Sequence, residues 1–186
     1  ELEAYPVEVE TYVCDVSNLD RVNEVVADAI QKLGKIDILV NCAAYGAGYG
    51  KGSQLEYMDD ATFMRGVDGT IGVTFRGIRE VVPYMKEHGG SIINYCSMYG
   101  LVSPDLRIYG DNPQKQPPNY GAAKAGVQQL TRYAAMDLAK PGDVIVASAA
   151  IRAEGTSREY MPLEFPAVSD SATASFINRV ISPVSP

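Results

Sequence analysis

The chain has 186 residues, of which 46% are hydrophobic and 21% are charged. This composition fits one globular domain that can bury roughly 70% of its extended-chain surface. With 16 basic against 23 acidic residues the net charge is -7. That balance argues against nucleic acid or an anionic membrane as a partner, because both favour clustered Lys and Arg.

The first predicted elements are a strand, a helix and a second strand. Residues 7–13 alternate apolar and polar side chains, which predicts a strand. Apolar positions three and four apart over residues 22–33 predict a helix with one buried stripe, capped by Ser17 or Asn18 and ended by Gly34. Residues 36–40 form a short apolar run, typical of a strand that is covered on both faces.

The remaining segments continue the same alternation. The predicted elements, in order, are a long imperfect helix from Asp59 or Asp60 to about Glu87, a strand over 91–96, a loop over 99–119, a helix over 120–139 and a strand over 144–151. Strands that alternate with helices predict parallel βαβ units and an α/β fold. Beyond residue 151 only residues 175–181 indicate a further helix.

Cysteine and histidine usage narrows the chemistry. The three cysteines, Cys14, Cys42 and Cys96, are far apart, and each lies in an apolar, strand-like segment. We therefore expect buried thiols in a cytoplasmic protein and no disulfide framework. The only histidine, His88, is expected at a helix end. Neither a metal site nor a Ser-His-Asp triad is expected.

Tyr120 and Lys124 open a predicted helix, and Ser97 ends the strand before it. A spacing of four residues places both side chains on one helix face. Tyrosine side chains have a pKa of about 10, and a nearby cation favours the phenolate form. A serine hydroxyl can hold a substrate oxygen beside the phenol, which predicts proton transfer in a carbonyl–alcohol interconversion. The alternative is an ordinary amphipathic surface pair.

Small or polar groups follow three predicted strands. Asp15, residues 41–44 and Ser97 each stand at a strand's carboxyl end, where open α/β sheets bind ligands. The alternative is ordinary strand-ending chemistry, which is common for Asp and Asn.

Five stretches together resemble the short-chain dehydrogenase/reductase family: residues 14–17, 37–44, 83–85, 92–97 and 120–124. The resemblance covers residues 1–150. It implies an incomplete Rossmann-like, doubly wound parallel sheet whose strands correspond to strands 3, 4, 5 and 6 of the family. The loop before Tyr120 is similar to that of a gluconate 5-dehydrogenase-like subgroup.

By this resemblance, Ser97 positions the substrate oxygen and Tyr120 is the general acid/base. Lys124 supports the tyrosine and holds the nicotinamide ribose. Asp15 and Val16 would contact the adenine of NAD or NADP. The residues expected near the adenosine ribose are Asn41, Cys42 and Ala43.

The resemblance also implies a small-molecule substrate such as a polyol or sugar, and a homo-oligomer in the complete protein through residues 60–87 and 120–139. Residues 1–151 would be a partial dinucleotide-binding domain, and residues 152–186 a poorly defined C-terminal segment of that domain. Ser97 and Tyr120 are 23 positions apart. The polar side chains of that long loop suit a hydroxyl-rich substrate, and the alternative is a variable surface loop.

Three departures from the family pattern shape the expectation. No segment matches the Gly-rich phosphate loop, Cys42 and Ala44 replace an Asn and a Gly, and Thr70 stands where an Asn is usual, with Asp68 nearby. We therefore expect an incomplete portion of a dehydrogenase, truncated at both ends, with bare strand edges. The alternatives are a non-catalytic remnant that binds no dinucleotide, and an epimerase or dehydratase that uses the same Tyr-Lys pair.

Overall fold

The computed structural model describes residues 9–48, 50–112, 115–139 and 144–149, and the structural statements below concern these residues. Contacts divide the chain into two units, residues 1–151 and 152–186. The second unit lies outside the described residues, and so does the helix expected over 175–181.

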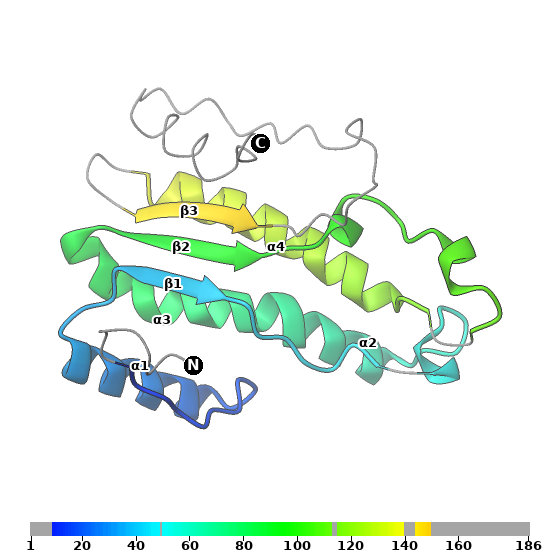
Figure 1. Cartoon of the computed structure of the whole chain (residues 1–186), viewed down its shortest axis with the longest axis horizontal. Coiled ribbons are helices and arrows are strands. Elements are labelled where there is room, and N and C mark those ends of the chain that lie inside the picture. Colours follow the sequence, from blue (N-terminus) through cyan, green and yellow to red (C-terminus); the bar gives the residue numbers. More distant parts are fainter. Residues whose placement is uncertain (1–8, 49, 113–114, 140–143, 150–186) are drawn as a thin grey trace. The chain divides into compact units, whose positions relative to one another are not determined.

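Three parallel strands form one sheet in the first unit (Figure 1). In the order β1-β2-β3, they span Ile38–Asn41, Gly90–Tyr95 and Val144–Ala149. Helical segments separate consecutive strands along the chain, as parallel pairing requires. The predicted parallel α/β architecture is therefore confirmed.

The described part of the chain contains four α-helices. They are α1 Leu19–Leu33, α2 Asp60–Val67, α3 Val73–His88 and α4 Pro118–Asp137. A π-helical turn, Asp68–Gly72, joins α2 to α3, so the long helix expected from residue 59 or 60 is continuous but irregular. Helix α4 begins at Pro118 and not at Tyr120, because the proline ring fixes φ near the helical value.

Local signals set the ends of α1. The side-chain oxygen of Asn18 accepts the backbone N–H of Arg21 at 3.1 Å and caps the helix. Gly34 ends it with a φ of 83°, a conformation that glycine adopts readily. The apolar stripe of α1 is only half-buried, with Val26 packed against the core.

Residues 9–13 do not form the strand that their alternation predicts, and residues 7 and 8 lie outside the described part. The segment bonds to α1 instead. Arg21 Nε donates to the carbonyl of Val13 at 3.2 Å, and Lys32 pairs with Glu10 at 2.9 Å. A strand is stable only with paired neighbours, which an alternating pattern cannot supply.

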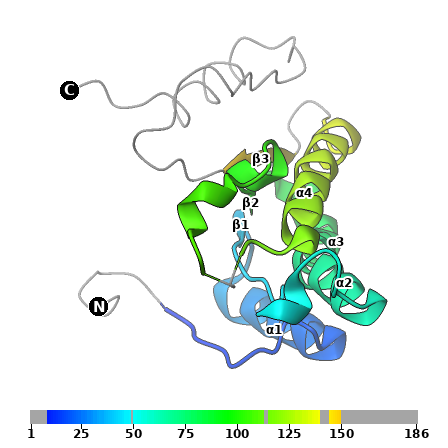
Figure 2. The ribbon, with the colours of Figure 1, turned by 90° about the vertical axis from the view of Figure 1, so that its right-hand side faces the viewer.

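Helices α3 and α4 cover the same face of the sheet (Figure 2). Along β2, Ile92 and Asn94 point into this layer and are fully buried, whereas Ile93 between them is only half-buried. On β1, Ile38 and Val40 are 62% and 50% exposed. The expectation that both faces of β1 are covered is therefore wrong for the described part of the chain.

The hydrophobic core lies between the sheet and these two helices. Val81 and Met85 from α3 and Ile92 from β2 are almost completely shielded from solvent. Full burial of such side chains stabilises the fold by about 1.5–3 kcal/mol each. The other buried members of the cluster are Ile78, Ala134, Leu138, Val144 and Val146. The core thus packs α3 and α4 against β2 and β3.

A chain of polar side chains crosses this core. Asn41 Nδ2 donates to Asn94 Oδ1 at 2.9 Å, and Asn94 Nδ2 donates to Thr131 Oγ1 at 3.0 Å. The Thr131 hydroxyl in turn donates to the carbonyl of Val127 at 2.7 Å. A Cβ on Gly77 would lie 2.4 Å from Asn41 Oδ1, so α3 passes directly over the asparagine. This row of hydrogen-bonded side chains, called the polar chain below, therefore ties β1 to β2 and β2 to α4.

We predict that Asn94→Ala lowers the free energy of unfolding by about 2–4 kcal/mol, because it leaves the Asn41 amide without its acceptor, removes the donor to Thr131 Oγ1 and opens a cavity. Denaturant unfolding followed by circular dichroism measures this. Gln129→Ala, an exposed change on α4, is the control and should stay within about 0.5 kcal/mol of the parent. Equal effects of the two changes would contradict the role given to the polar chain.

Candidate active site

Ser97 lies immediately beyond the carboxyl end of β2. Its backbone is extended, and its Oγ accepts the backbone N–H of Tyr99 at 3.2 Å, which starts the 3₁₀ turn Met98–Gly100. A hydroxyl that accepts one hydrogen bond keeps its own proton for donation. Ser97 can therefore donate to an oxygen placed at this edge of the sheet.

Tyr120 and Lys124 lie one turn apart at the start of α4. The Nζ atom of Lys124 is 5.8 Å from the centroid of the Tyr120 ring, within the range of cation–π attraction. Nζ also donates to the carbonyl oxygen of Tyr95 at 2.5 Å. The structure thus confirms that the two side chains share one face of the helix.

The Lys124 side chain is buried, with 8% of its surface exposed. Burial lowers the pKa of Lys124, and the neighbouring Cys96 and Cys42 thiols act in the opposite direction. An ammonium has three donors. With one directed to the end of β2, two remain for the phenol side of the site and for a ligand.

The 3₁₀ turn after β2 packs tightly on the first turns of α4. A Cβ on Gly100 would lie 2.8 Å from the backbone nitrogen of Ala125, and one on Gly121 would lie 2.9 Å from the carbonyl oxygen of Tyr99. Backbones approach this closely where no side chain intervenes. The contact brings the turn that begins at Ser97 onto the helix that carries the tyrosine and the lysine.

The carboxyl end of β1 is open to solvent. Cys42 and Ala43 are both exposed just past the strand, whereas the Asn41 amide is directed into the polar chain of the core. The prediction that Cys42 is a buried thiol is wrong, because this residue lies beyond the last paired residue of β1. Cys96 is buried as predicted, and Cys14 is half-buried.

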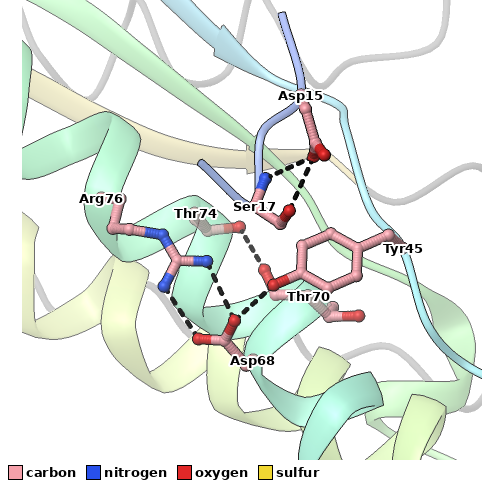
Figure 3. A network of polar contacts seen from close by, with 7 residues as sticks. All are labelled: Asp15, Ser17, Tyr45, Asp68, Thr70, Thr74 and Arg76. Carbon is pink, nitrogen blue, oxygen red and sulfur yellow. Dashed lines mark hydrogen bonds and ion pairs between the residues drawn. The ribbon is translucent and has the colours of Figure 1, made fainter. Parts of the chain in front are cut away.

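Asp15 and Val16 precede α1. The Asp15 carboxylate accepts the backbone N–H of Ser17 at 2.9 Å and its hydroxyl at 2.8 Å. These hydrogen bonds hold the pKa of Asp15 below its usual value, so the group is charged near neutral pH. Figure 3 draws the hydrogen bonds of this turn. Val16 is half-buried.

A pocket of about 780 Å³ lies between the loop after β2, residues 53–56 and the start of α4. Its lining includes Tyr99, Leu101, Leu106, Gly121 and Ala122. Ser97, Tyr120 and Lys124 do not line it. At 100° per residue, Ala122 faces away from Tyr120 on α4, so the pocket and the reactive groups lie on different faces of the helix.

The loop before α4 contains its own ion pair. Arg107 Nη2 lies 2.6 Å from Asp105 Oδ2, and Arg107 Nε donates to both oxygens of the same carboxylate. The pairing lowers the pKa of Asp105 to about 2. Two of the polar side chains expected to face a substrate are thus paired with each other on an exposed turn.

Sequence reasoning missed three groups: the Tyr95 carbonyl, Tyr45 and Arg76. A backbone carbonyl carries no sequence signal of its own. Tyr45 and Arg76 meet at the π-helical turn through Asp68, and the only cue to that turn was a helix unusually rich in glycine. Thr70, in the same turn, is 2% exposed, and its carbonyl accepts the Thr74 hydroxyl at 2.9 Å.

The described residues show neither a metal-binding cluster nor a membrane-spanning helix. Across residues 9–48, 50–112, 115–139 and 144–149, no three His, Cys, Asp or Glu side chains are grouped so that they could hold a metal ion. Within those same ranges, no helix has the length and apolar character needed to cross a membrane.

A sequence profile of the family described as short chain dehydrogenase matches residues 1–157. The chain therefore belongs to the short-chain dehydrogenase family. Likeness to solved members of that family, at TM-scores of 0.68 and 0.61, confirms that the three-stranded sheet is an incomplete Rossmann-like one.

Three relatives illustrate the match. The 3-oxoacyl-(acyl-carrier-protein) reductase FabG of Thermotoga maritima is 38% identical over 144 residues, which cover 75% of this chain and 51% of the relative. The 12alpha-hydroxysteroid dehydrogenase of a Clostridium species is 34% identical over 139 residues, covering 75% and 48%. A crystal structure of NAD+-bound xylitol dehydrogenase has a TM-score of 0.61 and 28% identity, covering 74% and 48%. The chain spans about half the length of the curated relatives it matches.

We predict that Gly100→Ala destabilises the protein by about 1–3 kcal/mol, because the new methyl group would overlap the backbone of α4. Thermal unfolding of the purified chain measures this. Gly52→Ala is the matched control, because a Cβ there meets no atom within 4 Å. If both variants unfold at the parent temperature, the close contact between the 3₁₀ turn after β2 and α4 is incorrect.

Proposed function

We propose that this protein is an NAD- or NADP-dependent oxidoreductase that interconverts a carbonyl and a secondary alcohol, with Tyr120 as general acid/base. The observation that carries the proposal is the buried ammonium of Lys124, which lies beside the Tyr120 ring and is held by the end of β2. Burying an ammonium costs free energy. The ammonium lies next to the phenol that is the proposed proton-transfer group.

In the proposed reaction, Ser97 holds the substrate oxygen and Tyr120 transfers the proton. In the oxidation direction, Ser97 donates a hydrogen bond to the substrate hydroxyl oxygen, and Tyr120 acts as the general base that removes the hydroxyl proton. The hydrogen on the substrate carbon leaves as hydride, for which a bound nicotinamide dinucleotide supplies the acceptor. In the reduction direction, Tyr120 returns the proton to the carbonyl oxygen.

The described residues fit parts of such a dinucleotide. Asp15 offers a charged carboxylate, and Cys42 and Ala43 present small, exposed groups just past the end of β1. We assign Asp15 and Val16 to the adenine. The residues that we assign to the adenosine ribose are Asn41, which acts through the backbone turn, Cys42 and Ala43. Lys124 keeps donors for the nicotinamide ribose.

A polyol or sugar is the proposed substrate. The polar residues of the loop after Ser97 and the likeness to xylitol dehydrogenase support this class, and the loop length supports the gluconate 5-dehydrogenase-like subgroup. The 12alpha-hydroxysteroid dehydrogenase relative supports a competing choice, a secondary alcohol on a largely apolar body.

A homo-oligomer is the proposed state of the complete protein. Large apolar side chains are exposed along α2, α3 and α4: Met64, Phe75, Tyr84, Tyr133 and Met136. Exposed apolar side chains on neighbouring helices favour association. We further propose that residues 1–151 form the dinucleotide-binding domain, that residues 152–186 belong to the same domain, and that the protein is cytoplasmic.

We predict that Tyr120→Phe reduces turnover at least about 100-fold, because it removes the only proton-transfer group assigned to the reaction. Nicotinamide absorbance with xylitol, gluconate and a hydroxysteroid as separate substrates measures this. Tyr133→Phe makes the same chemical change at an exposed position of α4 and should retain parent activity. Undiminished turnover by Tyr120→Phe would exclude the mechanism.

A binding measurement separates this proposal from a non-catalytic protein. Fluorescence of NADH and of NADPH is recorded while the purified protein is added. Enhancement of either signal, retained in Tyr120→Phe, is expected, because the phenol contributes to chemistry more than to affinity. No change with either dinucleotide would favour the non-catalytic alternative.

A further inference from the structure

A set of three side chains joins the segment after β1 to the π-helical turn (Figure 3). The Tyr45 hydroxyl donates to the Asp68 carboxylate. Arg76 reaches the same carboxylate with two nitrogens, Nη1 to Oδ1 at 2.8 Å and Nη2 to Oδ2 at 3.1 Å. A two-pronged contact of this kind fixes both direction and distance. We call Tyr45, Asp68 and Arg76 the Tyr45 clamp.

The backbone reinforces the clamp. The N–H of Tyr45 donates to the carbonyl oxygen of Gly69 at 3.0 Å, an acceptor inside the π-helical turn. A Cβ on Gly69 would lie 2.0 Å from the carbonyl oxygen of Tyr45, and a Cβ on Gly72 would lie 2.3 Å from Asp68 Oδ1. The turn therefore accommodates both the loop and the carboxylate only because these two positions lack side chains.

The protonation states of Asp68 and Tyr45 favour the hydrogen bonds of the clamp. The Arg76 guanidinium, followed by the Tyr45 hydroxyl, lowers the pKa of Asp68, so that the carboxylate is charged at neutral pH. Burial, followed by the Asp68 hydrogen bond, raises the pKa of Tyr45, so that its hydroxyl keeps the proton that it donates. Arg76 has 17% of its side chain exposed and Asp68 has 49%, so the pair is partly shielded from solvent screening.

The clamp adjoins one of the proposed cofactor-contacting segments. Tyr45 directly follows residues 41–44, and its backbone and side chain are both held by the π-helical turn (Figure 3). We propose that Tyr45, Asp68 and Arg76 are positioning residues, which fix residues 42–44 in the conformation that receives the dinucleotide. They act through the backbone of that segment and not by contact with the reacting atoms. The inference rests on the proposed function, but the clamp itself can be tested without it.

The first measurement is amide hydrogen exchange in the ligand-free protein. Tyr45→Phe removes only the hydroxyl and should speed exchange at the backbone amides of Tyr45 and Gly46 roughly five-fold, the loss expected for one hydrogen bond. Tyr84→Phe, at a half-exposed position of α3, is the matched control and should leave these amides at the parent rate. Unchanged exchange in Tyr45→Phe would overturn the clamp whether or not the protein is an enzyme.

The second measurement separates positioning from general stability through steady-state kinetics. We expect Tyr45→Phe and Asp68→Asn to raise the KM for NAD or NADP roughly three- to ten-fold with kcat within about two-fold of the parent, because binding must first order the loop. Arg76→Lys should retain more affinity than Arg76→Ala, since it keeps the charge. A fall in kcat with unchanged KM would overturn the positioning role. If the parent protein binds neither dinucleotide, the proposed function fails while the exchange result still decides the clamp.

Discussion

The anchoring of α4 to β2 decides where the candidate catalytic groups lie. Two consecutive residues of β2 make the anchor: Asn94 bonds through its side chain to Thr131, and Tyr95 bonds through its carbonyl to Lys124. Thr131 and Lys124 are about two helical turns apart. The helix can therefore neither slide nor rotate against the strand without breaking a buried polar contact, which costs free energy. Tyr120 takes its place from that constraint.

Elements whose signals are local could be predicted from the sequence. Asn18 and Gly34 delimit α1 as their chemistry predicts, and the spacing of Tyr120 and Lys124 places both on one face of α4. Long-range pairing could not be predicted in the same way. Residues 9–13 have the alternation of a strand but bond to α1, and the solvent-exposed face of β1 depends on which segments cover it. Neither outcome is a property of the segment's own residues.

The candidate site likewise contains residues that local sequence signals predict and residues that depend on long-range contacts. Ser97, Tyr120 and Lys124 were identified because each stands beside a recognisable strand end or helix start. The Tyr45 clamp is not predicted, because it depends on a π-helical turn, Asp68–Gly72, inside a helical segment. Such turns are frequent at functional sites. Glycines within a helix, which weaken it without evident reason, are the one signal that could have directed attention there.

The two halves of the site differ in how they are built. Ser97, Tyr120 and Lys124 all belong to one βα unit, β2 with α4, whose packing is local in sequence. The proposed cofactor edge instead includes Asp15, residues 41–44 and the π-helical turn, so its shape depends on segments far apart in the chain. Fixing such a surface costs more chain entropy than fixing one βα unit. A clamp with a charged, two-pronged contact is therefore most useful on the cofactor side, where the loop would otherwise have to be ordered by the ligand itself.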